Sequence, residues 1–84
     1  MEKSIFSAQY KCLLERLRER RRAAGMTQAQ LAARLQQTQS FVSKCERGER
    51  RLDVVELGAF CRAIGIDFVQ FVASLEKDTD VAGR

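Results

Sequence analysis

Two short helical patterns separated by a tight turn constrain this chain more than any other feature. The first begins at Thr27, whose hydroxyl can accept a backbone N–H while the side chain of Gln30 reaches back to another, which is the capping-box arrangement. The second begins at Thr38, a favoured N-cap residue, and ends at Gly48, where a left-handed backbone is easily adopted. Two helices joined so closely predict a helix-turn-helix.

The apolar and polar positions of these two helices fall on different faces. Leu31 and Leu35 share one face of the first helix, and Val42 and Cys45 share one face of the second. The outward positions of the second helix carry polar side chains that are short or flexible enough to reach base edges: Gln39, Ser40, Ser43 and Lys44. The pattern therefore predicts a second helix that enters the DNA major groove.

The first helix of the chain is predicted to run from Ser7, a suitable N-cap, to Gly25, with one charged residue on its apolar stripe. The stripe recurs every three or four residues: Tyr10, Leu13, Leu14, Leu17, Arg21 and Ala24. A guanidinium at Arg21 needs a carboxylate partner, because burying it unpaired would be costly. Glu46 is the candidate partner, since it lies near the end of the motif's second helix among basic residues.

Two further helices follow the motif and complete the predicted fold. Capping-box spacing recurs at Asp53 and at Asp67, each followed three residues later by a carboxylate or amide side chain. No strand pattern competes, so the expected fold class is all-α, a compact five-helix bundle. Residues 1–6 are expected to form a flexible N-terminal arm, residues 7–76 the domain, and residues 77–84 a polar C-terminal tail.

Composition excludes several classes of function. The 84 residues contain three cysteines at irregular spacing and no histidine, so neither a disulfide framework nor a metal site is expected. Cys45 and Cys61 fall on apolar faces, and Cys12 is expected to be more exposed.

No nucleophile–base pair or phosphate-binding glycine loop occurs at motif spacing, so we expect no enzyme and no cofactor. The sequence shows no signal peptide and no long apolar run, which favours a cytoplasmic protein without membrane insertion.

The net charge of +4 hides an asymmetry between two parts of the chain. Residues 1–52 contain 12 Lys/Arg and 5 Asp/Glu, giving +7, and residues 53–84 contain 3 and 6, giving −3, which sum to +4. A basic first part suggests a surface that faces a polyanion, and an unevenly charged solvated surface is the alternative. The arginine-rich run over residues 16–22 is interpreted as a solvated helix face.

Three stretches carry a motif pattern that extends beyond the helix-turn-helix itself. They are LRERRRAAGMTQAQLA (17–32), QSFVSKCERGERRL (39–52) and AIGID (63–67). With these stretches the chain resembles the lambda repressor/Cro-like helix-turn-helix family of bacterial and phage regulators, of the xenobiotic-response-element type. The combination of G-x-T-Q-x-x-L-A with S-x-V-S-K-x-E-R-G is more specific than either half. The resemblance implies a compact five-helix fold and members that usually bind operator DNA as dimers.

The resemblance also implies roles for particular side chains. Gln28 matches a glutamine that typically holds a phosphate and braces the recognition helix. The positions that face DNA on that helix are matched by Gln39, Ser40, Ser43 and Lys44, and loop positions near the DNA backbone by Arg47, Arg50 and Arg51. From side-chain chemistry we expect base contacts from Gln39, Ser40 and Lys44, and phosphate contacts from Gln28, Ser43, Arg47, Arg50 and Arg51, with Arg34 as a further candidate. Arg21 and Glu46 match a buried ion pair seen in several members. Two departures are Gln36, where the turn usually has glycine, and Leu52, near where the loop usually has proline. Gln36 must therefore adopt a left-handed conformation, or the turn must shift.

Alternative interpretations exist for some of these positions. Gln39 and Ser40 can be polar residues of a helix N-terminus that need no partner, and Lys44 can reach either a base or a phosphate. Phe41 can cover a thymine methyl group or pack on the protein, and packing is favoured because Val42 beside it is apolar.

We expect double-stranded DNA as the partner and a homodimer as the binding form. One recognition helix offers a small interface, and specific affinity usually needs two half-sites. The last helix has more apolar residues than one stripe requires, and Phe68, Val69 and Val72 are the candidate dimer interface. The alternative is that all of them belong to the core.

The leading hypothesis is a sequence-specific transcriptional regulator at the nucleoid, acting as a repressor that binds a palindromic operator. An antitoxin that also binds a toxin is a second version of this hypothesis. A protein-interaction module that has kept the bundle and lost DNA binding is the alternative from a different class, and the retained polar and basic positions argue against it.

Overall fold

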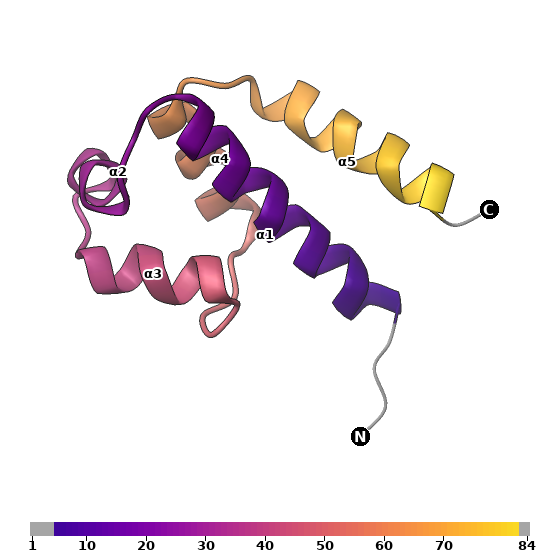
Figure 1. Ribbon diagram of the computed structural model, residues 1–84, viewed down its shortest axis with the longest axis horizontal. Coiled ribbons are helices and arrows are strands. Elements are labelled where there is room, and N and C mark those ends of the chain that lie inside the picture. Colours follow the sequence, from indigo (N-terminus) through magenta and orange to yellow (C-terminus); the bar gives the residue numbers. More distant parts are fainter. Residues whose placement is uncertain (1–4, 83–84) are drawn as a thin grey trace.

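Residues 5–82 form five α-helices that share one core (Figure 1). The computed structural model describes the backbone of residues 5–82 and the side chains of residues 7–77. The helices are α1 (Ile5–Ala23), α2 (Gln28–Leu35), α3 (Gln39–Arg47), α4 (Val54–Ile64) and α5 (Phe68–Ala82). The predicted all-α class is confirmed over this range, and α2 and α3 form the helix-turn-helix.

The outer ends of α1 and α5 differ from the predicted ends. α1 begins at Ile5, so Ser7 lies inside the helix, and only residues 1–4 of the expected arm remain, outside the described residues. α5 continues to Ala82, so most of the expected polar tail is helical. Residues 5–7 and 77–82 contain no glycine or proline that would stop a helix, and a serine or a polar composition only favours an end.

Side-chain caps set the starts of α2, α3 and α4, as predicted. Thr27 Oγ1 accepts the Gln30 N–H at 3.0 Å, and Gln30 Oε1 accepts the Thr27 N–H at 2.9 Å. Asp53 and Glu56 form the same reciprocal box at 2.7 and 2.9 Å, and Thr38 caps α3 with one bond. These caps satisfy backbone N–H groups that the first turn of a helix leaves unpaired, so helix starts are encoded locally.

The turn between α2 and α3 is closed by a glutamine in a left-handed conformation. Gln36 has φ 57° and ψ 42°, and no other non-glycine residue between positions 5 and 82 has a positive φ. Its N–H donates to the Ala33 carbonyl at 3.1 Å, and the Gln37 N–H donates to the Ala32 carbonyl at 2.9 Å. The last carbonyls of α2 are therefore paired as they would be with glycine. Of the two alternatives for the missing glycine, the left-handed one is correct.

Replacing Gln36 with glycine is expected to stabilise the protein. A left-handed residue that carries a Cβ costs about 1–2 kcal/mol, and the greater freedom of glycine in the unfolded chain offsets up to about 1 kcal/mol of this. We expect Gln36→Gly to raise the free energy of unfolding by up to about 1 kcal/mol in a urea titration. Gln37→Gly is the matched control. It should only lower the free energy of unfolding, because Gln37 does not have a positive φ and glycine there adds freedom to the unfolded chain without relieving strain. A Gln36→Gly variant less stable than the wild type would contradict the prediction.

The core receives apolar side chains from every helix. Phe60 of α4 and Phe71 of α5 are its largest fully buried side chains, and Cys45 and Cys61 are buried with them. Burial raises the pKa of both thiols, so they remain neutral and act as small core side chains, as predicted. Cys12 is half-buried.

Within the described range, no single helix is long and apolar enough to cross a membrane. The consecutive segments Val54–Ile64 and Phe68–Lys77, bent by 110°, have sufficient length and apolar composition only when taken together. Their buried side chains, which include Phe60 and Phe71, supply the core of the bundle.

Candidate nucleic-acid interface

Helix α3 has one buried face and one polar, exposed face. Val42, Cys45 and Glu46 are buried against the bundle. The positions predicted to contact bases, Gln39, Ser40 and Lys44, are exposed, and Ser43 is half-exposed beside them. In Figure 1, α3 lies at the margin of the bundle. The structure thus brings the predicted base-contacting residues together on one helix surface, which we call the α3 face.

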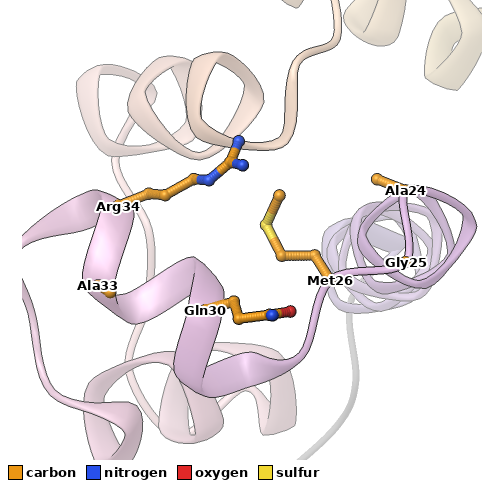
Figure 2. A pocket seen from close by; sticks show the side chains of 6 residues that line it. All are labelled: Ala24, Gly25, Met26, Gln30, Ala33 and Arg34. Carbon is orange, nitrogen blue, oxygen red and sulfur yellow. The ribbon is translucent and has the colours of Figure 1, made fainter.

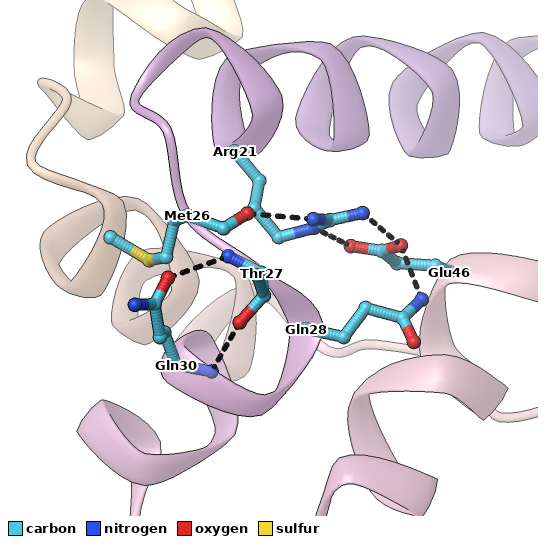
Figure 3. Close-up of polar contacts among 6 residues, drawn as sticks. All are labelled: Arg21, Met26, Thr27, Gln28, Gln30 and Glu46. Atoms are coloured by element: carbon cyan, nitrogen blue, oxygen red, sulfur yellow. Dashed lines mark hydrogen bonds and ion pairs between the residues drawn. The ribbon is translucent and has the colours of Figure 1, made fainter.

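A buried ion pair attaches α3 to the two preceding helices (Figure 3). Arg21 Nε and Nη2 donate to the two carboxylate oxygens of Glu46 at 2.7 and 3.1 Å. Arg21 Nη1 donates to the Met26 carbonyl at 2.8 Å, and Gln28 Nε2 donates to Glu46 Oε1 at 2.9 Å. Arg21 and Glu46 are only 6% and 9% exposed, so the pair expected from the sequence is present inside the bundle.

This network sets how α3 is oriented. A two-bond contact between a guanidinium and a carboxylate has a planar geometry, so it restricts rotation as well as distance. Gln28 opens α2 and braces α3 through Glu46, which is the bracing role that the resemblance implied. Its amide retains a second N–H donor, which its expected phosphate contact would use.

Arg47, expected to meet a phosphate, is paired with a carboxylate of its own chain. Its Nε and Nη2 donate to the two carboxylate oxygens of Glu49 at 2.9 and 3.2 Å, and its Nη1 donates to Ser43 Oγ. The hydrogen bond from Arg47 is the main reason that the pKa of the Glu49 carboxyl is lowered. Glu49 is therefore ionised at neutral pH, and the pair carries no net charge.

Arg50 is held by α4 and by an aromatic ring. Its Nη1 and Nη2 donate to the two carboxylate oxygens of Glu56 at 3.1 and 2.8 Å, and its Nη1 also donates to the Arg51 carbonyl. Its guanidinium carbon lies 4.8 Å from the centre of the Phe41 ring. Arg50 therefore joins the α3–α4 loop to both helices, a structural role that the sequence analysis missed.

Phe41 packs on the protein, in agreement with the favoured interpretation. It is half-buried against the core, with its ring centre 6.2 Å from that of Phe60. The Arg50 guanidinium lies over the same ring, so Phe41 contacts both the core and the loop.

Tyr10 connects the same loop to α1. Its hydroxyl oxygen accepts the Leu52 N–H at 2.9 Å, and the Arg51 guanidinium lies over its ring at 4.1 Å. From the sequence, Tyr10 is predicted only to lie on the apolar stripe of the first helix. The hydrogen bond joins residues 42 positions apart, so no local signal could have revealed it.

Arg34, the further phosphate candidate, is directed at the end of α4. Its Nη1 donates to the Ala63 carbonyl at 3.0 Å. Figure 2 shows it lining a shallow pocket with Met26 and Gln30. In this position Arg34 donates a hydrogen bond to a carbonyl in the last turn of α4. The carbonyls of that turn have no partner within the helix. A phosphate contact would require it to leave that carbonyl.

The candidate dimer residues on α5 divide into two groups. Phe68 is half-buried and packs against the core, so it serves the monomer. Val69 and Val72 are 74% and 41% exposed. Val54 and Val55, at the start of α4, are also exposed apolar residues.

Comparison with known proteins agrees with this geometry. A family model described as a helix-turn-helix domain matches residues 13–70. Among solved structures, an XRE-family like protein from Pseudomonas syringae pv. tomato str. DC3000 is similar, with 55% sequence identity and a TM-score of 0.87. The similarity covers 89% of this chain and 92% of that chain. No curated protein matches the chain.

The chain belongs to the XRE/Cro-like helix-turn-helix family. It is a DNA-binding transcription regulator, because the helix-turn-helix match and the XRE-family relative agree on that class. Regulators with this fold are typically not enzymes.

Proposed function

We propose that the protein is a repressor that binds a palindromic operator as a homodimer, with one α3 helix of each protomer in the major groove. The observation that supports this most directly is the α3 face, whose polar residues are exposed while the buried Arg21–Glu46 pair holds the helix in place. A rigid support of this kind keeps base-contacting side chains at a constant position relative to the duplex.

Two kinds of contact follow from this placement. Gln39 can bond to both edge atoms of an adenine, Lys44 can reach a guanine, and Ser40 can bond to either base. The phosphate contacts are assigned to residues on α2, on α3 and in the following loop: Gln28, Ser43, Arg47, Arg50 and Arg51. Contacts to phosphate give affinity and orientation, whereas contacts to bases give sequence choice.

The homodimer is proposed to form through α5. Val69 and Val72 supply its exposed apolar surface, with Phe68 at the edge, where it also packs on the monomer core. A twofold arrangement would place two recognition helices on one face of the duplex.

Selection of bound sites from random DNA tests the proposal. The expected result is a palindrome whose half-sites lie about 10 base pairs apart, centre to centre. Affinity for the selected site should fall by about 10³-fold or more between about 50 and 200 mM salt, because several phosphates are neutralised. Placing the site over a promoter should then reduce transcription of a reporter.

Three results would count against the proposal. A selected site without symmetry would exclude the homodimer, and increased transcription would exclude the repressor. Affinity that is absent at low salt, or insensitive to salt, would exclude DNA binding and favour the protein-interaction module.

A further inference from the structure

Glu49 is an exposed carboxylate placed beside the proposed DNA-binding surface. It follows the glycine that ends α3, and it pairs with Arg47 on the last turn of that helix. The two side chains are 54% and 56% exposed. Lys44 of the α3 face also contributes to lowering the pKa of the Glu49 carboxyl, so the carboxylate acts on two cations of this surface.

The Arg47–Glu49 pair differs from the other exposed arginine pair in the loop region. Glu56, the partner of Arg50, also accepts the Asp53 N–H and so completes the cap of α4. The backbone N–H of Glu49 donates to the Lys44 carbonyl at the end of α3, a bond that does not involve its side chain. Among the side-chain bonds described for residues 7–77, the Glu49 carboxylate caps no helix, and Arg47 is its hydrogen-bonding partner. An exposed pair of this kind contributes little to folding stability.

A DNA phosphate would compete with Glu49 for the same donors. Nε and Nη2 of Arg47 face the two carboxylate oxygens, and a phosphate presents oxygens that suit the same two-bond geometry. Nη1 is directed at Ser43 Oγ, so three of the five N–H donors of the guanidinium are engaged within the chain. A neutral pair also neutralises little phosphate charge, so it releases few of the cations condensed on DNA when the protein binds.

We propose that Glu49 limits the affinity of the α3 face for DNA by holding Arg47 in a carboxylate pair that a phosphate must displace. The proposal rests on the DNA-binding function given above. As a consequence, the affinity of the protein for DNA depends less on contacts to the DNA phosphates and more on contacts to the bases. Phosphate contacts carry no sequence information, so Glu49 lowers the affinity for specific and unrelated DNA alike.

The test is Glu49→Gln, with binding measured on the selected site and on unrelated DNA of the same length. We expect about fivefold tighter binding to both at low salt, and a plot of log K against log salt that is steeper by about 0.9 per protomer. Glu19→Gln is the matched control, since Glu19 is an exposed carboxylate on α1, on the opposite side of that helix from the buried Leu17 and Arg21. It should change affinity by less than about twofold.

A double-mutant cycle with Arg47→Gln separates the pairing from simple repulsion. If Glu49 acts by holding Arg47, the gain from Glu49→Gln disappears in the Arg47→Gln background. A gain that persists there means that Glu49 repels DNA directly, and it overturns the proposal. Unchanged binding by Glu49→Gln overturns it too, while leaving DNA binding intact. A wild-type protein that binds no DNA would overturn both proposals.

Discussion

Replacing Glu46 with alanine is expected to lower the free energy of unfolding by about 3–5 kcal/mol. The substitution leaves the Arg21 guanidinium inside the bundle with the Met26 carbonyl as its remaining described partner. A buried charge without a counter-charge keeps its desolvation penalty and loses the attraction that offset it. Since small domains are stable by only about 5–15 kcal/mol, much of this protein's stability should be lost.

Urea titration followed by circular dichroism measures this effect, and two variants serve as controls. Gln28→Ala removes a single bond to Glu46 and should cost about 1 kcal/mol. Replacing Arg21 and Glu46 together with methionine removes both charges, and it should restore most of the stability lost in Glu46→Ala. A Glu46→Ala variant no less stable than Gln28→Ala would show that the pair is not the anchor of α3.

Replacing Gln39 and Lys44 with alanine is expected to have the largest effect on sequence choice. Each side chain is exposed on the α3 face. Each is assigned a base contact that discriminates by about 1–3 kcal/mol. The selected site should lose most of its advantage over unrelated DNA in the double variant, while affinity for unrelated DNA should change little. The ratio of the two dissociation constants at fixed salt is the measurement.

Arg51→Ala is the comparison variant, because a phosphate contact should weaken both DNAs by the same factor. Arg50 is unsuitable for this purpose, since its bonds to Glu56 and its position over Phe41 make it part of the folded loop. If alanine at positions 39 and 44 weakened both DNAs equally, the division between base and phosphate contacts would be wrong.

The sequence alone predicted the features that depend on short spacing. Each capping box lies within four consecutive residues, so Thr27 with Gln30 and Asp53 with Glu56 were readable without a structure. The Arg21–Glu46 pair spans 25 positions, yet it was predictable, because a guanidinium on an apolar stripe requires a carboxylate. The outer ends of α1 and α5 were not predicted correctly, because residues 5–7 and 77–82 include no glycine or proline that would stop a helix.

How the charged residues around α3 are paired was not predictable before the helices were placed in space. In the sequence, Arg47, Arg50 and Arg51 were all possible phosphate ligands, since an exposed guanidinium can bind any nearby anion. The fold places Glu49 against Arg47, Glu56 against Arg50, and the ring of Tyr10 under Arg51. The sequence by itself determined the helices and the buried anchor, because propensity and burial act through local pattern. The pairing of surface charges depends on side-chain distances that exist only after the helices have packed.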